Sequence, residues 1–159
     1  LTFAIAYLRD FAVTNGLLGE SFETFVNYSE LETMVENVKE FIFKEHRRRG
    51  ISGKPLVSAR VTQLYEQGAC VYFYFLMDFS GLGERASDVY DEIETGARSV
   101  IMANGGSVSH HHGIGKHRGQ FMKGGKAMSE GMEGMVQGIK KAIDPDDIFG
   151  VKNGSFFVE

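Results

Sequence analysis

The residues best suited to chemistry are three adjacent histidines, His110, His111 and His112. Imidazole ionises near neutral pH, so such a cluster can move protons, donate hydrogen bonds to an anion or bind a metal. In an extended backbone, His110 and His112 point to one side and His111 to the other. A turn would be needed to bring the three rings together, and Gly113 and Gly115 make a turn there possible.

The pattern leaves three interpretations of this segment open. A metal site could use His110, His112 and His117, since nitrogen-only ligand sets are known for zinc. No Cys, Asp or Glu between residues 105 and 118 completes a ligand set, so we predict no metal. Alternatively, the imidazoles and the backbone N–H groups of the glycine-rich turn could hold an organic cofactor or an anionic substrate. A surface triplet without a function is the third interpretation.

A second candidate is the phenol of Tyr72, in a run of apolar and aromatic residues. Side chains in a strand alternate between its two faces, so the valine and phenylalanine side chains should share one face and pack on helices. The other face carries two phenols, and a buried tyrosine hydroxyl needs a partner, so this face should border a cavity. Most strand tyrosines are merely packed, and the pattern alone does not decide the role of Tyr72. The two faces comprise Val71, Phe73, Phe75 and Met77, and Cys70, Tyr72, Tyr74 and Leu76.

Basic residues lie near the ends of two predicted helices. Arg9 stands near the end of the first predicted helix, where an arginine is usually solvated or paired, although it could also contact a ligand. The run from His46 to Arg49 follows the second predicted helix, and cations there suit the negative end of the helix dipole. A phosphate or membrane contact is the alternative for this run.

The elements that must position these residues follow from periodicity. Apolar residues at helical spacing predict helices over residues 3–13, 29–44, 87–103 and 129–142. Strands are predicted over 17–26, 56–65 and 69–79, the last two forming an antiparallel hairpin. Ser29 and Glu32 have the spacing of a capping box, and the histidine segment should begin as a short strand. This order predicts an α+β domain with an antiparallel sheet and helices packed on one face.

Composition excludes several classes of protein. The 159 residues are 43% hydrophobic, with 13 Phe and 7 Met, which is typical of a globular domain. The net charge of −4 argues against a dedicated nucleic-acid surface. Cys70 is the single cysteine, so no internal disulfide framework is possible. No apolar run in the sequence is long enough to cross a bilayer.

Several blocks of the sequence resemble one enzyme family, the alkyldihydroxyacetonephosphate synthases, which are flavoproteins of ether-lipid (plasmalogen) synthesis. The resemblance covers residues 7–153, and the blocks agree in order and spacing. The chain is also similar to the C-terminal end of vanillyl-alcohol-oxidase-type flavoproteins, including D-lactate dehydrogenases. Those commonly have a Glu where this chain has His111, which favours the synthases. The blocks are residues 7–10, 18–24, 60–63, 68–75, 103–107 and 109–118, with Asp144-Pro145 and Ile148-Phe149-Gly150.

The resemblance implies a transferase that uses FAD. The family replaces the acyl group of 1-acyl-dihydroxyacetone phosphate with a long-chain fatty alcohol, and FAD serves as a covalent trap without net redox change. By the same resemblance, Tyr72 matches the proton donor and acceptor, with a pKa that nearby flavin and histidines could lower. His110, His111 and His112 match a triplet needed for activity. Arg9 matches the arginine that grips the substrate phosphate, a task suited to its planar fork of donors.

The resemblance also implies a division of the chain. Residues 1–104 would be part of the substrate (cap) domain, and residues 105–159 the histidine segment and a C-terminal helical tail. The FAD-binding domain, which holds most of the cofactor, would lie N-terminal to this chain, so the cofactor-binding residues are unknown and the isolated piece should be inactive. A homodimer, a peripheral membrane contact and a peroxisomal location are further expectations, although Phe157-Val158-Glu159 is no C-terminal peroxisomal address.

Two rival functions stay open at this point. One is an FAD-linked 2-hydroxy-acid dehydrogenase of the D-lactate or glycolate type, which would reduce its flavin with the hydroxy acid. The other is a non-catalytic module that binds a metal or another ligand, which would hold stoichiometric metal and fold without a further domain.

Overall fold

The computed structural model describes residues 2–150, with side chains from residue 7 onward. The chain forms two compact units, Leu1–Gly106 and Ser107–Glu159, and each is described by itself. None of the described helices is both long enough and apolar enough to span a bilayer.

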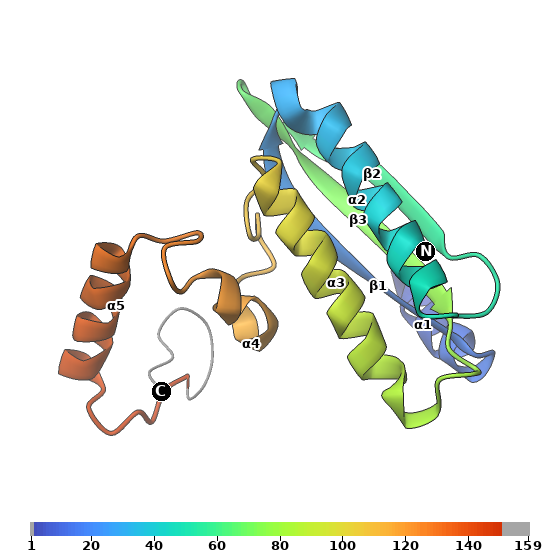
Figure 1. Ribbon diagram of the computed structural model, residues 1–159. Coiled ribbons are helices and arrows are strands. Elements are labelled where there is room, and N and C mark those ends of the chain that lie inside the picture. The colour runs from blue at the N-terminus through green and yellow to red at the C-terminus, as the bar shows by residue number, and fades with distance from the viewer. Residues whose placement is uncertain (1, 151–159) are drawn as a thin grey trace. The chain divides into compact units, whose positions relative to one another are not determined.

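The first unit is an α+β fold, as the sequence predicts. In chain order its elements are α1 (Thr2–Thr14), β1 (Leu17–Asn27), α2 (Tyr28–Arg48), β2 (Leu56–Leu64), β3 (Gly68–Asp78), a 3₁₀ turn (Gly83–Arg85) and α3 (Ala86–Ala103) (Figure 1).

The three strands form one antiparallel sheet in the order β1-β3-β2. The predicted hairpin of β2 and β3 is confirmed, and β1 pairs along the whole of β3, from Leu17 opposite Asp78 to Asn27 opposite Gly68. β3 is therefore the central strand, although it is the last of the three in the chain.

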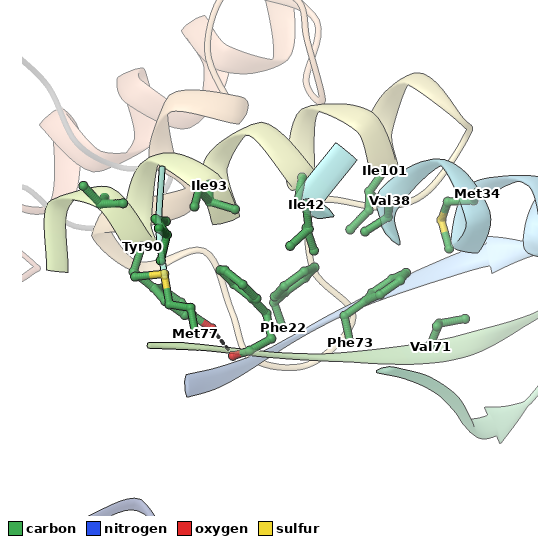
Figure 2. Close-up of a cluster of buried hydrophobic side chains, with 14 of the residues drawn as sticks. Phe22, Met34, Val38, Ile42, Val71, Phe73, Met77, Tyr90, Ile93 and Ile101 are labelled. Atoms are coloured by element: carbon green, nitrogen blue, oxygen red, sulfur yellow. Dashed lines mark hydrogen bonds between the residues drawn. The ribbon is translucent and has the colours of Figure 1, made fainter. Parts of the chain in front are cut away.

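Helices α2 and α3 cover one face of the sheet and enclose the hydrophobic core between them and the strands (Figure 2). Phe22 and Phe73 stack there at 5.2 Å between ring centroids. The predicted alternation along β3 is confirmed, because the valine and phenylalanine face is the buried one. The core comprises Phe22, Val26, Val71, Phe73, Phe75 and Met77 from the strands, Met34, Val38 and Ile42 from α2, Ile51 from the loop after α2, and Val89, Tyr90, Ile93, Ala97 and Ile101 from α3.

Two local predictions are wrong. The helix α2 begins at Tyr28, its N-cap is Asn27, and no side chain caps it, so Ser29 and Glu32 lie inside the helix rather than in a capping box. The reason is tertiary, because the Tyr28 N–H donates to the Gln67 carbonyl (3.2 Å) and the Tyr28 hydroxyl to the Tyr65 carbonyl (2.8 Å). These bonds hold the chain at the hairpin turn and start the helix there.

The histidine segment does not begin as a strand, since residues 107–114 form no ladder. The Ser107 hydroxyl instead donates to the Ser109 carbonyl at 3.1 Å, a local bond that competes with strand pairing.

The second unit contains α4 (Gly115–Arg118), a 3₁₀ turn (Gly119–Phe121) and α5 (Glu130–Ile143). Ser129 caps α5 by accepting a bond from the Met132 N–H. After the helix, the Asp144 carboxylate accepts bonds from the N–H groups of Ile148 and Phe149, both at 2.9 Å, and pairs with Lys140. The Asp144 side chain thus connects the two parts of the sequence motif, Asp144-Pro145 and Ile148-Phe149, by hydrogen bonds.

Candidate active site

The face of the sheet opposite to α2 and α3 carries the two phenols of β3. Tyr72 and Tyr74 are half-buried there, and their rings lie 6.1 Å apart with 27° between the planes. We call this surface the phenol face; its residues are Gly19, Ser21 and Glu23 of β1, Tyr72, Tyr74 and Leu76 of β3, and Leu56, Ser58 and Arg60 of β2.

Charged residues flank Tyr72 on both neighbouring strands. Glu23 of β1 and Arg60 of β2 are its register partners, so both side chains start on the same face as the phenol. Arg60 is exposed and its guanidinium lies 5.5 Å from the ring centroid of Tyr74, in a cation–π contact.

These surroundings raise the pKa of the Tyr72 phenol above its ordinary value. Burial is the main cause, electrostatic interactions with Cys70, Glu23 and Tyr74 add to it, and Arg60 opposes it. This direction is opposite to the lowering expected beside a flavin and histidines. A raised pKa favours the protonated phenol, the form that can donate a proton.

A cleft of about 870 Å³ opens at one end of the phenol face. It brings Arg9 and Tyr74 together, whereas Tyr72 lies two residues further along the strand and does not line it. The walls are largely apolar, and they comprise Leu8, Arg9, Asp10, Ala12 and Val13 of α1, Leu18, Gly19, Glu20 and Ser21 of β1, and Leu56, Tyr74, Phe75 and Leu76.

Arg9 is the strong cation of this cleft. Its guanidinium pairs with Glu20, and 62% of the Arg9 side chain and 44% of the Glu20 side chain are exposed. An exposed pair of this kind contributes little to stability, so the guanidinium can exchange its carboxylate partner for another anion at small cost.

The three histidines lie in the second unit, in a turn rather than a strand. Gly113 and Gly115 have φ angles of 78° and 55°, a region that favours glycine, so the turn that these glycines make possible is found where a short strand was predicted. His110 and His111 approach to 2.9 Å between their Nδ1 atoms. The rings of His111 and His112 make an edge contact at 4.6 Å. A shared pocket of these rings with Tyr72 stays a prediction.

The phenol face suits the aromatic ring of FAD, whereas the N-termini of α2 and α3 do not suit its pyrophosphate. The stacked phenols with Arg60 suit contact with a flat aromatic ring. A pyrophosphate, by contrast, binds best at a helix N-terminus free of negative charge. Both α2 and α3 have an acidic residue in the first turn, Glu30 and Asp88, which repels an anion there.

Comparison with known proteins assigns the chain to a family. Residues 1–152 match the family described as FAD linked oxidases, C-terminal domain. The chain belongs to this family. The cofactor expected from the sequence, FAD, is confirmed by this membership, and the family also accounts for the α+β fold.

The family members most informative for this chain are synthases. The chain is 47% identical over 155 residues to the alkyldihydroxyacetonephosphate synthase of Caenorhabditis elegans, covering 96% of this chain and 25% of the relative. It is 29% identical to the enzyme of that name from Dictyostelium discoideum, covering 91% and 23%. The resemblance seen in the sequence is thereby confirmed. The chain spans about a quarter of the length of these curated relatives.

A solved structure agrees with this assignment. An alkyldihydroxyacetonephosphate synthase structure superposes with a TM-score of 0.62 at 25% identity, covering 91% of this chain and 22% of that one. An uncharacterized FAD-linked oxidoreductase of Escherichia coli K12 is 31% identical over 90 residues, 53% of this chain and 17% of the relative.

Sequence reasoning missed the charged neighbours of the candidate site. Glu23 and Arg60 were not singled out as functional, and Glu20 was not recognised as the partner of Arg9. The position of Arg60 could have been predicted from the hairpin, because the pairing of β2 with β3 places Arg60 opposite Tyr72. For Glu23 and Glu20 no local signal existed, since β1 pairs with a strand more than forty residues away in the chain.

Proposed function

We propose that this chain is the C-terminal part of an enzyme of ether-lipid synthesis, which exchanges the acyl group of an acyl-dihydroxyacetone phosphate for a long-chain fatty alcohol. The observation that carries this proposal is the 47% identity to a synthase over 96% of the chain. The geometry is compatible with it, because Arg9 lines a largely apolar cleft together with Tyr74, the residue that stacks on Tyr72.

The chain's own residues would bind the substrate and move a proton. Arg9 would bind the phosphate, exchanging Glu20 for the ligand, since a guanidinium donates to two phosphate oxygens at once. The apolar walls around Leu8 and Leu56 would exclude water from the adjoining carbons. The hydroxyl of Tyr72 would donate a proton to, or accept one from, the groups at substrate C1, and His110, His111 and His112 would shape the surroundings of the headgroup.

FAD, when bound, supplies the reactive ring at which the exchange takes place. Among the residues of this chain, Tyr72, Tyr74 and Arg60 suit contact with that ring. The remaining expectations belong to the same proposal: residues 1–104 as part of the cap domain, residues 105–159 as histidine segment and tail, an FAD-binding domain on the N-terminal side, a homodimer, a peripheral membrane contact and a peroxisomal location. They are supported by the resemblance to the synthases alone.

A second candidate is the oxidation of a 2-hydroxy acid, which the family description as oxidases favours. The two functions differ in their redox outcome. An oxidase or dehydrogenase would bleach its flavin when lactate or glycolate is added without an electron acceptor, whereas the exchange leaves the flavin oxidised at completion. Flavin absorbance with each substrate separates them.

The proposed role of Tyr72 is tested by Tyr72→Phe in the intact, flavin-loaded protein. We expect alkyl transfer to fall by about 100-fold or more, because general acid–base catalysis typically contributes that much. Incorporation of labelled fatty alcohol into the phosphate product is the measurement, and flavin absorbance verifies loading.

The matched control is Tyr28→Phe, which removes an exposed phenol at the hairpin end and should leave transfer unchanged. Full turnover by flavin-loaded Tyr72→Phe would remove Tyr72 from the mechanism.

A further inference from the structure

Tyr72 stands in a row of three side chains that crosses the whole sheet. Glu23, Tyr72 and Arg60 are aligned by the register of β1, β3 and β2, so an acidic residue and a basic residue are the paired neighbours of Tyr72 on the two adjacent strands. Directly paired residues of an antiparallel sheet start about 5 Å apart at Cβ, close enough for charges to interact.

The two charged neighbours have opposite effects on the phenol. A carboxylate favours the protonated form, and a guanidinium favours the phenolate. Cys70 and Tyr74 of its own strand also favour the protonated form. Arg60 is a cation that favours the phenolate of Tyr72, and it opposes both burial and Glu23.

Both neighbours of Tyr72 make further contacts, Arg60 through its side chain and Glu23 through its backbone. Arg60 is held over the ring of Tyr74, which stacks on Tyr72. On the core side, the buried guanidinium of Arg98 donates to the backbone carbonyl of Glu23 at 3.3 Å and to Glu94 at 3.0 Å. The strand β1 is therefore anchored at the residue that pairs with Tyr72.

We infer that Arg60 is a positioning residue for proton transfer at Tyr72: it stabilises the phenolate from β2, while Glu23 holds the protonated form from β1. This inference rests on the proposed function, because it assigns partners to the proton-transfer group of that reaction. Arg60 acts through Tyr72 and is not itself proposed to touch the substrate.

The first test does not depend on activity. The full-length, flavin-loaded protein is labelled with 3-fluorotyrosine, whose phenol ionises at lower pH than tyrosine, and the ¹⁹F signal missing in Tyr72→Phe identifies Tyr72. We expect Arg60→Gln to move the titration of that signal to higher pH and Arg60→Lys to move it less. Glu23→Gln should move it to lower pH.

The matched control is Arg47→Gln, which removes an exposed arginine from α2, on the opposite side of the sheet. It should leave the Tyr72 titration in place. A Tyr72 signal that titrates identically in wild type and folded Arg60→Gln would overturn the inference. Because Arg60 is exposed, this variant should fold, and the answer does not depend on the buried Glu23.

The second test measures the reaction. If the proposed function holds, Arg60→Gln lowers kcat by about 10-fold with little change in KM, as expected for one lost charge interaction of about 1 kcal/mol or more. The pH dependence of kcat should shift in the same direction as the ¹⁹F titration, and Arg60→Lys should restore part of the rate. Absence of alkyl transfer in wild type would refute the proposed function, while the ¹⁹F titration would still decide whether Arg60 controls Tyr72.

Discussion

At the scale of single residues, the buried titratable side chains show how the fold constrains protonation. His46 is 3% exposed near the end of α2, and its Nε2 atom has no hydrogen-bond partner. Burial lowers the pKa of this imidazole, and the negative charge of Asp78 opposes the change only in part. Tyr90 is the contrasting case, because its buried hydroxyl accepts from the Glu20 N–H and donates to the Phe75 carbonyl, both at 2.9 Å.

His46 should make the first unit sensitive to acid. Because the pKa of His46 is lower in the folded state than its ordinary value of 6.5, the unfolded chain binds the proton more readily. The free energy of unfolding therefore falls as the pH drops from about 6.5 through the folded pKa. Urea unfolding of wild type and His46→Gln across this range measures the effect, and the variant should lose less stability on acidification.

The control for this prediction is His117→Gln, which replaces an exposed histidine of α4. Its pH dependence should match that of wild type. An identical acid response in His46→Gln and wild type would show that His46 does not carry the effect.

Some residues of the candidate site could be predicted from the pattern of neighbouring residues in the sequence, and others could not. Tyr72 was placed on the correct face by alternation along a single strand. Its neighbours Glu23 and Arg60 were not predicted from the sequence, since they are placed beside Tyr72 only when the three strands pair. The role of Arg9 came from resemblance, because spacing alone could not distinguish it from a surface arginine.

At the scale of elements, the helices and strands were predictable wherever burial imposes a period. All three strands and the four longer helices were expected within a few residues, since each buries one face or stripe. The first residue of α2 was not predicted correctly, because hydrogen bonds from Tyr28 to the hairpin turn determine where this helix begins. The histidine turn was only half predicted, since glycine allows a turn but does not specify its course.

The pairing of β1 with β3 depends on a glycine at the start of β3. A Cβ at Gly68 would lie 2.2 Å from the Val26 carbonyl oxygen and 2.9 Å from the Asn27 Cα. Both are backbone atoms, so Gly68→Ala should separate the strands there and cost about 1–3 kcal/mol. Hydrogen exchange of the amides in β1 and β3 is the measurement.

A glycine in α5 serves as the control, because its replacement by alanine should stabilise the protein rather than destabilise it. Gly134 has no atom within 4 Å of an added Cβ, so Gly134→Ala should stabilise α5 by up to about 1 kcal/mol through helix propensity. Slower exchange in α5 would agree with this. Undiminished protection of β1 in Gly68→Ala would contradict the close approach of the two strands.

At the scale of the whole molecule, the two units differ in what holds them. Every member of the main buried hydrophobic cluster belongs to the first unit. In the second unit, residues 144–149 make polar contacts around Asp144, whose pKa is lowered by bonds from Lys140 and the Phe149 N–H. In the same part of the chain, Ile143 and Phe149 are more than 70% exposed.

Asp144→Asn should therefore loosen the segment 144–150 and leave the first unit intact. The amides of Ile148 and Phe149 lose their carboxylate acceptor and should exchange faster, while the amides of β3 keep their protection. Because the pKa of Asp144 is lowered, the same loosening should occur in wild type as the pH falls below about 3.8, the ordinary value, through the folded pKa.

Asp146→Asn is the control, since Asp146 is exposed and its replacement should change neither amide. Equal exchange rates at Ile148 in Asp144→Asn and wild type would exclude the carboxylate as the anchor of this segment.

The strand order β1-β3-β2 has a consequence for biosynthesis. The hairpin of β2 and β3 joins neighbouring stretches of chain and can form early, whereas β1 must wait for a partner synthesised some forty residues later. Until β3 has been synthesised as far as Asp78, β1 cannot complete its pairing with β3. The cleft that Arg9 lines is also incomplete until then, because residues of β3 form part of it. During translation, β1 therefore emerges with an unpaired hydrogen-bonding edge before its partner strand is available.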